Sequence, residues 1–498
     1  MLLPLLVALL ALAAPAHAGN AKPATVPALQ RWEGGQGSFA VRSRTRVIAP
    51  KRLRADARLL ARDLTLQTAR RKPRRGDVVL KLGARGRRLG EEGYRLRIGR
   101  RVTIRARRRA GVFYGTRTLL NLLRGGGRAP RGRAADWPRY RERGLMLDTG
   151  RLFFPRKWLE QRIREMADLK LNLLHLHFSD NEGYRLESKT HPEIVDDPHL
   201  THADIRSLQR LARRRHVTIV PELDMPGHLT AALEPHPELQ LENRFGQKQA
   251  DKLDVTLPEA REFVADLLGE YLPLFEGPWW HSGADEYLGI VSTENDYELY
   301  PQLEAYADEK YGEGANGKDA VTDFTNFVGE KVRAAGKRMR VWSDGMPGGA
   351  LVELEPTAAV EWWENRTSHP PGELMADGRE LTNAGWWPLY YVTGGPLQGL
   401  RASEEEMYEE WDPWHFEGPW TTRWLTGDPE PEPFLVPEDA ENQLGAQLNV
   451  WNDVPHAMTV EEIAEGIAPR LRILAQKTWG SPQLTDDYEE FKTLGGAE

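Results

Sequence analysis

The stretch Trp279-Trp280-His281-Ser282-Gly283-Ala284-Asp285-Glu286 decides both the fold class and the chemistry that the chain can support. An apolar, aromatic start followed by a polar turn is typical of a buried strand of a parallel sheet. Two ionised carboxylates side by side repel each other, and burial raises the pKa of a carboxyl group. One member of the pair can then stay protonated near neutral pH while its neighbour is charged, as general acid catalysis requires.

Similar apolar runs recur on both sides of this stretch and alternate with helical segments. Such alternation indicates βα units around a parallel sheet. Eight runs predict a (β/α)8 TIM barrel, in the α/β class, preceded by a small α+β domain. The runs are Leu145–Leu147, Leu171–Phe178, Val217–Leu223, Trp279–Gly283, Met339–Trp342, Ala358–Trp363, Trp386–Val392 and Ala446–Trp451.

Polar residues follow each run, and the active site of such a barrel lies at the carboxyl ends of its strands. Acidic residues there could simply cap the next helix. Caps do not explain why Trp342, Trp363 and Trp451 stand at the same level. Aromatic rings suit the C–H face of a sugar, and acidic groups suit its hydroxyl rim. The polar residues are Asp148, Asp180, Asp224, Asp285-Glu286, Ser343-Asp344, Glu364, Thr393 and Asn452-Asp453.

The first third of the chain has a different pattern. Short alternating strands are predicted at Val78–Leu82, Tyr94–Ile98 and Val102–Arg105, with helices over 56–67 and Gly111–Leu123. Glycines 125–127 and a following proline indicate a linker. We expect a small α+β domain over residues 19–138 and the catalytic barrel over 139–498.

Charge is divided sharply between these parts. Residues 19–140 carry 33 Lys and Arg against 7 Asp and Glu, a net +26, whereas the later residues carry 34 against 66, a net −32. This division favours either a docked pair of domains or a basic surface for an anionic partner. A merely solvated Arg-rich face is the simplest alternative. The basic residues form no recognisable nucleic-acid module, so we expect no nucleic acid partner.

The N-terminus predicts export. An apolar stretch over Leu2–Ala14 precedes Ala16-His17-Ala18, which is typical of a signal peptide cleaved after Ala18. The stretch is too short to span a membrane. We therefore expect a secreted, extracellular protein without a membrane span, and the absence of Cys excludes disulfides and thiolate metal sites.

The adjacency of Asp285 and Glu286 limits the possible reaction. Ordinary glycosidases place two carboxyl groups roughly 5–10 Å apart across the scissile bond. Neighbouring residues of a strand point to opposite faces, so this pair does not easily straddle one bond. A substrate with a 2-acetamido group brings its own nucleophile. One carboxyl group then protonates the leaving oxygen, and the other steadies the acetamido nitrogen.

Several motifs resemble glycoside hydrolase family 20, the β-N-acetylhexosaminidases. Glu92-Gly93-Tyr94 and Gly111–Gly115 also resemble the small domain that precedes the barrel in that family. Some pieces look most like the dispersin-type branch, which cuts β-1,6-linked N-acetylglucosamine polymers; they are Phe178-Ser179-Asp180, Trp342-Ser343-Asp344-Gly345 and Leu389-Tyr390-Tyr391-Val392. The family-wide motifs are Arg143–Asp148, His175–Asp180, Pro221–His228, His281–Glu286 and Val450–Asp453.

The resemblance implies a role for each matching residue. Glu286 would be the general acid and then the base, and Asp285 would orient the 2-acetamido group. Asp180 and His228 would set the charge of this pair. The substrate contacts would come from Arg143 (ring hydroxyls), Trp342 and Trp363 (acetamido wall), Trp451 (floor), Asp453 (outer hydroxyls) and either Tyr390 or Tyr391 (acetamido oxygen).

The resemblance further implies a retaining, exo-acting enzyme that needs no cofactor or metal and binds an N-acetylhexosamine-containing oligosaccharide or polysaccharide. A dispersin-like hydrolase is the alternative within the family. Four positions depart from the family pattern and bear on sugar preference or on the turn; they are Ala284 for Gly, Leu152 for His, Asp453 for Glu and Thr393 for an acid.

Two other classes remain open. A metal-dependent barrel hydrolase could use His175 and His177, which share one face of a strand, together with His228 and Asp224. Loss of activity on chelation would favour it. A carbohydrate-binding protein without catalysis would bind sugar but show no turnover, although the intact acidic pair argues against it.

Overall fold

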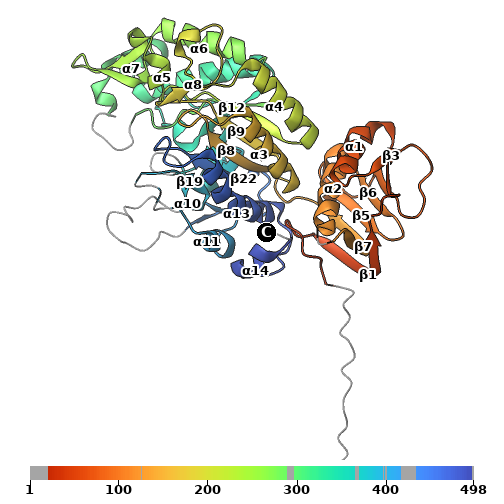
Figure 1. The fold of residues 1–498 in the computed structure, drawn as a ribbon. Coiled ribbons are helices and arrows are strands. Elements are labelled where there is room, and N and C mark those ends of the chain that lie inside the picture. The colour runs from red at the N-terminus through yellow and green to blue at the C-terminus, as the bar shows by residue number, and fades with distance from the viewer. Residues whose placement is uncertain are drawn as a thin grey trace, which may run out of the picture. The chain divides into compact units, whose positions relative to one another are not determined.

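The chain forms two compact units, Met1–Asp136 and Trp137–Glu498, in the computed structural model (Figure 1). The structure describes residues 21–495 except 125, 289–295, 365–368, 396–397, 399–400 and 417–432. The predicted signal peptide over residues 1–18 lies outside the described residues. Among the helices that are described, none combines the length and apolar character needed to cross a bilayer.

The first unit is an α+β domain built on one seven-stranded sheet, in the order β1-β7-β5-β6-β4-β2-β3. Helix α2 contacts β5, β6 and β7, while α1 contacts β2, β3 and α2. The elements are β1 (Arg31–Ala40), β2 (Arg46–Ile48), α1 (Arg54–Asp63), β3 (Gln67–Ala69), β4 (Val78–Leu82), β5 (Tyr94–Ile98), β6 (Val102–Ala106), α2 (Arg109–Leu123) and β7 (Arg128–Asp136).

Two glycines bring helix α2 close to the sheet. A Cβ atom at Gly111 would lie 2.3 Å from the Gly93 carbonyl oxygen, and one at Gly115 would lie 2.5 Å from Cγ2 of Ile104. The predicted linker over residues 125–130 is corrected in its second half. Residues from Arg128 onward enter strand β7, which pairs antiparallel with β1 and β5, because alternate residues can bury small side chains there.

The second unit is a closed parallel barrel of eight strands, as predicted. The order around the barrel is β8-β9-β12-β15-β16-β17-β18-β22, and β22 pairs with β8 to complete the circle. The strands are β8 (Glu142–Asp148), β9 (Leu173–His177), β12 (Thr218–Glu222), β15 (Trp279–His281), β16 (Arg338–Trp342), β17 (Ala359–Trp362), β18 (Leu381–Asn383) and β22 (Gln443–Trp451).

The seventh strand differs from the prediction. The run Trp386–Val392 was expected to form it, but Leu381–Asn383 (β18) closes the barrel by pairing with β17 and β22. Residues Trp386–Leu389 instead turn into the short helix α10, which contains Pro388. The chain then returns as β19 (Tyr390–Val392), which pairs with the carboxyl-terminal half of β22.

Helices surround the barrel, and four of those described begin with a capping box in which Thr201, Asn316, Ser403 or Thr459 accepts from a backbone N–H of the first turn. Small additional strands are β10 (Ser179–Asp180), β11 (Gly183–Tyr184), β13 (Gln240–Glu242), β14 (Lys248–Leu253), β20 (His415–Phe416) and β21 (Phe434–Leu435). The helices are α3 (Arg156–Asp168), α4 (His202–Arg215), α5 (Thr230–Leu233), α6 (Pro258–Tyr271), α7 (Pro301–Tyr311), α8 (Gly317–Ala334), α9 (Pro371–Ala376), α10 (Trp386–Leu389), α11 (Glu404–Glu409), α13 (Val460–Trp479) and α14 (Tyr488–Thr493).

The segment over 394–443 is rich in Glu, Asp and Pro, and its length and composition predict a loop beside the barrel mouth. Its described parts hold helix α11 and the antiparallel pair β20 and β21. Residues 417–432 of the segment lie outside the described residues.

Candidate active site

The turn after strand β15 sets the positions of the two adjacent acids. Gly283, Ala284 and Glu286 all have a positive φ, of +65°, +74° and +49°. A Cβ atom at Gly283 would lie 1.8 Å from Oδ1 of Asp224, so only glycine fits there. The left-handed region costs a residue with a side chain roughly 1–2 kcal/mol. The turn therefore holds Ala284 and Glu286 in a strained backbone, as occurs at functional sites.

Asp285 points into the protein. Its side chain is 12 % exposed and hydrogen-bonds to the carboxyl group of Asp224. Burial raises the pKa of Asp285, and the nearby charges of Glu222 and Glu286 raise it further. Burial also raises the pKa of Asp224 well above its usual value, with Asp285 adding to the effect. The two carboxyl groups therefore resist being ionised together and can share a proton.

Glu286 points toward solvent, with 39 % of its side chain exposed. Its backbone N–H donates to Oδ2 of Asp344 at 2.9 Å. His228 lies between the two acids, with Nε2 3.6 Å from Oε2 of Glu286 and 3.7 Å from Oδ2 of Asp285. The adjacent acids thus occupy different surroundings, one buried and one accessible, and both face the same imidazole.

His228 is held by Asp180, whose Oδ1 lies 3.2 Å from Nδ1. Burial alone would lower the pKa of His228, but the Asp180 carboxylate outweighs burial and holds that pKa well above its usual value. Burial alone would raise the pKa of Asp180, but Arg151 and His228 keep it well below the usual range. The structure thus places His228 beside both acids and Asp180 behind His228, and their role in setting the charge of the acidic pair stays a prediction.

The guanidinium near these acids belongs to Arg151, which sequence analysis missed. Arg151 pairs with Asp180 at 2.9 Å, with Asp148 at 3.1 Å and with Glu182 at 3.2 Å. Its Cζ atom also lies 5.4 Å from the ring centroid of Trp451. The residue follows strand β8 directly, at the end where the other polar residues gather.

The assignment of ring hydroxyls to Arg143 is corrected. Arg143 is the second residue of β8, about five residues and roughly 16 Å before the carboxyl end of that strand. It is fully buried, and its guanidinium donates to the carbonyl oxygens of Tyr140 at 2.7 Å and Lys170 at 2.8 Å. A residue at the start of a barrel strand lies at the end of the barrel opposite the site. Arg143 therefore has a structural role at that end.

Four aromatic side chains gather beside the acidic pair. Trp342, Trp363, Tyr390 and Trp451 pack on one another, with ring centroids 5.7–6.1 Å apart. The indole N–H of Trp342 donates to Glu222 at 2.7 Å, and that of Trp363 donates to Asp344 at 2.8 Å. These bonds fix the planes of two rings, so the wall is rigid before any ligand arrives.

The structure distinguishes the two candidate tyrosines. Burial, with the charge of Asp285 second, holds the pKa of Tyr390 well above its usual value, and its ring stacks on Trp363. Tyr391 points the other way, because its ring lies under Arg401 at 3.9 Å and its hydroxyl oxygen lies toward Gly466 of helix α13. The candidate for the acetamido oxygen is therefore Tyr390, and Tyr391 lies outside the site.

The outer rim carries Asp453 and Thr393. Burial raises the pKa of Asp453 to about 6, even though Arg151 opposes this shift. The hydroxyl of Thr393 is buried and hydrogen-bonds to Oδ1 of Asn452 at 3.1 Å. Leu152, which replaces a common His, is also buried. Asp453 is therefore the rim group that changes charge in the weakly acidic range.

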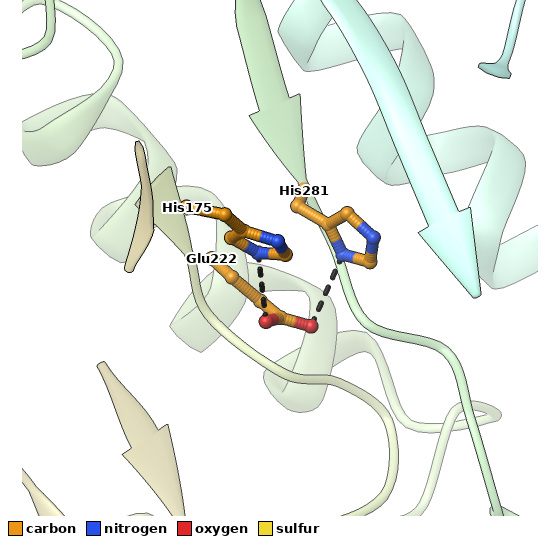
Figure 2. Close-up of side chains that lie close together, drawn as sticks. All are labelled: His175, Glu222 and His281. Carbon is orange, nitrogen blue, oxygen red and sulfur yellow. Dashed lines mark ion pairs between the residues drawn. The ribbon is translucent and has the colours of Figure 1, made fainter. Parts of the chain in front are cut away.

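Beneath the site, Glu222 joins side chains from several strands. Figure 2 shows the rings of His175 (β9) and His281 (β15) facing its carboxylate from neighbouring strands. Nε2 of His175 lies 2.9 Å from Oε2, and Nδ1 of His281 lies 3.1 Å from Oε1. Nδ1 of His177 lies 2.6 Å from the same carboxylate oxygen that His175 approaches, Oε2 of Glu222. All these side chains are fully buried.

The pairing continues in both directions. Toward the site, Nε2 of His177 lies 2.8 Å from Asp180. Away from it, His175 pairs with Glu361 at 3.3 Å, Glu361 with Arg340 at 2.9 Å, and Arg340 with Glu142 at 2.5 Å. We refer to these side chains as the barrel charge network; its members are Glu142, Arg340, Glu361, His175, Glu222, His177, Asp180 and His228.

The pKa shifts in the barrel charge network have opposing causes. Burial would lower the pKa of His175, but Glu361 and Glu222 raise it to about 9. Burial would raise the pKa of Glu222, but the three histidines hold it well below the usual range. Carboxylates and cations thus alternate, and each charge is neutralised by its neighbours.

The histidine pairing also bears on metal chemistry. The ligand atoms of His175, Glu222 and His281 lie within 4.8 Å of one another and could hold an ion. The same donors satisfy each other as ion pairs, and the trio lies inside the barrel below Asp285 rather than beside Glu286. A chelation test separates these two possibilities.

Both units of the chain resemble known proteins. The family described as "Glycosyl hydrolase family 20, catalytic domain" matches residues 140–482, and "Glycosyl hydrolase family 20, domain 2" matches residues 22–137. A lacto-N-biosidase of Bifidobacterium bifidum is 30% identical over 95% of this chain and 41% of its own length. A beta-hexosaminidase of Porphyromonas gingivalis is 26% identical over 94% of this chain and 61% of its own length. The chain thus spans less than two thirds of these relatives.

Solved structures agree along most of the chain. The GH20 beta-N-acetylhexosaminidase of Streptomyces coelicolor has 27% identity and a TM-score of 0.72, and the match covers 94% of this chain and 93% of that one. A mutant Streptomyces plicatus beta-hexosaminidase in complex with its product, GlcNAc, has 26% identity and a TM-score of 0.73, with 95% and 93% covered.

Proposed function

Since the chain belongs to glycosyl hydrolase family 20, we propose that it is a retaining β-N-acetylhexosaminidase acting by substrate-assisted catalysis. The substrate is a glycan with a terminal β-linked N-acetylglucosamine or N-acetylgalactosamine. One observation carries the proposal. Adjacent residues of one turn place Glu286 toward solvent and Asp285 in a buried contact with Asp224.

This division assigns the steps. Glu286 donates a proton to the leaving glycosidic oxygen while the acetamido carbonyl oxygen of the substrate attacks C1. The C1–O bond breaks, and an oxazolinium-type intermediate forms. Asp285 accepts a hydrogen bond from the acetamido N–H and steadies the developing positive charge. Glu286 then takes a proton from water, which opens the intermediate with net retention.

The surrounding groups fit a pyranose held in this position. Trp342, Trp363 and Tyr390 would enclose the acetamido group, and Trp451 would lie under the ring. Arg151 and Asp453 would bind ring hydroxyls, since both lie at the rim near Glu286. Their preset geometry reduces the cost of orienting the substrate.

A second candidate is hydrolysis of lacto-N-biosides, the activity stated by the name of the 30% identical relative. Thr393, at the rim of the site, favours this second candidate. Thr393 is hydrogen-bonded to Asn452 and carries no acidic group. This side of the sugar therefore lacks the acid with which many family members would hold a terminal hydroxyl.

The decisive experiment compares an aryl β-N-acetylglucosaminide with the matching aryl β-glucoside, each with and without chelator. Turnover of only the acetamido sugar, unaffected by chelator, supports the proposal. Equal turnover of both, or loss on chelation, would refute it and direct attention to His175 and His281. An aryl lacto-N-bioside and a β-1,6-linked N-acetylglucosamine oligomer complete the panel and separate the second candidate and the dispersin-like alternative.

The role of Asp285 needs its own test. Asp285→Asn should lower kcat by about 10²–10³, as for loss of one preorganised electrostatic group. A thiazoline analogue of the intermediate should inhibit the wild-type protein strongly. Export forms part of the proposal too, and N-terminal sequencing of the mature protein should find Gly19 first.

A further inference from the structure

One face of the sheet in the first unit carries basic side chains in register. Along β5, Tyr94, Leu96 and Ile98 are buried, whereas Arg95 and Arg97 between them are exposed. The buried side chains lie on the face that contacts α2, which also contacts β6 and β7. The exposed arginines therefore lie on the opposite face of the sheet.

Cross-strand pairing places like charges directly beside each other on this face. Arg95 lies opposite Arg105 of β6, and Arg97 lies opposite Arg133 of β7. Lys81 of β4 lies beside Arg105 in the parallel pair. On the outer side, the first row continues through Ala135 to Arg31, and the second ends at Glu33. We name five of these residues the arginine ladder; they are Lys81, Arg95, Arg97, Arg105 and Arg133.

Like charges directly opposite each other destabilise an antiparallel pair. Within the described part of the chain, Arg95, Arg97, Arg105 and Arg133 form no ion pair with a carboxylate, and the guanidinium of Arg95 donates to the Arg85 carbonyl oxygen. Neighbouring strands lie about 4.8 Å apart and alternate residues about 6.8 Å apart. The ladder is therefore a dense, flat array of cations.

The carboxylates of the first unit are used elsewhere. Asp77 pairs with Arg46, Asp63 with Arg117, Asp56 with Arg109, and Glu91 with Arg108. Asp136 accepts from Tyr94, and Glu92 accepts from Tyr114. Of the seven acids in residues 19–140, only Glu33 belongs to the two ladder rows. The fold pairs arginines on other surfaces with these carboxylates, and Glu33, opposite Arg133, is the one acid that lies in the ladder rows.

We propose that the arginine ladder binds a linear acidic glycan, one that carries sulfate or carboxylate groups along its length. Guanidinium groups bind such oxyanions through two parallel hydrogen bonds. A flat sheet suits a chain lying across several strands, whereas duplex DNA is read by a helix or a two-stranded ribbon that enters a groove. The choice of a glycan rests on the proposed function, because the barrel would act on the same class of polymer.

The experiment uses the full-length protein and labelled dextran sulfate, which contains no hexosamine and so does not test the barrel site. Binding is titrated at about 0.1 M and about 1 M salt, where the screening length falls from about 10 Å to about 3 Å. Neutral dextran and duplex DNA are the comparison polymers. Hydrolysis of the aryl β-N-acetylglucosaminide is measured in parallel, so failure of the proposed function appears separately.

The test variant is R97Q/R105Q/R133Q. Its matched control is R52Q/R58Q/R62Q, which removes the same charge from exposed positions at and before helix α1, where no ion pair is recorded among the described residues. The ladder variant should bind dextran sulfate about tenfold more weakly at low salt, and the control should change less than about twofold. R97K/R105K/R133K should retain binding within about threefold, which shows that the sheet is still folded.

Three results would overturn the proposal. Equal losses in the ladder variant and its control would mean that net charge acts without a site. Tighter, ladder-dependent binding of duplex DNA would assign the face to a nucleic acid. No binding of dextran sulfate, together with a salt-dependent change in the radius of gyration, would mean that the acidic second unit occupies the ladder.

Discussion

Charges in the two units are arranged by opposite rules. In the barrel charge network, carboxylates alternate with cations over eight side chains, six of them buried, and each charge has a partner within about hydrogen-bonding distance. In the arginine ladder, cations stand beside cations on an exposed sheet face. Buried charges are tolerated only when partners neutralise them, and the alternation in the barrel charge network supplies those partners. The second is tolerable because water and salt screen exposed charges, so its cost is small and it can serve binding.

The largest effect is expected at the end of the barrel charge network that meets the substrate. Glu286→Gln removes the general acid, so kcat on an unactivated chitooligosaccharide should fall by about 10²–10⁴. Aryl substrates with a good leaving group should lose less, because their leaving oxygen needs no proton. Steady-state kinetics on both substrates measure the difference. Retained activity on the unactivated substrate would remove Glu286 from this role.

The next test breaks the alternation itself. Glu222→Gln leaves an acceptor for the Trp342 indole but removes the charge shared by His175 and His177. Breaking a buried pair costs about 3–5 kcal/mol, so the free energy of unfolding should fall by that amount. Urea denaturation measures it. Glu405→Gln, at an exposed position of helix α11, is the control and should change stability by less than about 0.5 kcal/mol. A similar small loss in both variants would contradict the network.

The pH dependence of stability sharpens the same contrast. His175 has a pKa of about 9 in the folded state against 6.5 in the unfolded chain. A raised histidine pKa contributes stability that is fully present below pH 6.5 and is lost as the pH rises through about 9. This group accounts for at most roughly 3 kcal/mol. Thermal unfolding followed from pH 6 to pH 10 should show the decline, and a constant melting temperature across that range would count against a charged His175.

A smaller effect is expected at the rim. Asp453, with a pKa of about 6, becomes ionised as the pH rises through that value and then accepts stronger hydrogen bonds from sugar hydroxyls. KM should therefore fall by about fivefold between pH 5 and pH 7, since a charge-assisted bond adds roughly 1 kcal/mol. Asp453→Asn should abolish this change in KM while leaving the pH dependence of kcat. An unchanged KM profile in the variant would assign the titration to another group.

The smallest effect concerns the arginine ladder. Arg97→Thr removes one like-charge pair and should raise the free energy of unfolding by about 0.2–1 kcal/mol at low salt, with no gain at high salt. Arg58→Thr on helix α1 serves as the control and should show no salt-dependent gain. A loss of stability at low salt in Arg97→Thr would mean that Arg97 has a stabilising partner.

Sequence patterns predicted the barrel because most of its strands contain a run of apolar residues, such as Leu145–Leu147 in β8 and Ile219–Val220 in β12. They missed β18, since Leu381-Thr382-Asn383 is short and mostly polar. The resemblance also led to Arg143 in place of Arg151. Strand direction could have corrected this, because a residue at the start of a barrel strand lies at the end away from the site.

Adjacent aromatic residues posed a different difficulty. Tyr390 and Tyr391 differ in position because neighbours on a strand face opposite sides, and the sequence does not record which side faces the site. The barrel charge network lay beyond prediction for another reason. Its members come from separate strands, and only the closed barrel brings Glu222 within reach of His175 and His281.

The turn that carries the two acids also constrains how this chain can diverge. A Cβ atom at Gly345 would lie 2.8 Å from the Cβ atom of Ala284, so the methyl group of Ala284 occupies the space that a side chain at 345 would need. The two positions are therefore epistatic. While Ala284 is present, position 345 has room only for glycine, and a side chain at 345 would require a smaller residue at 284.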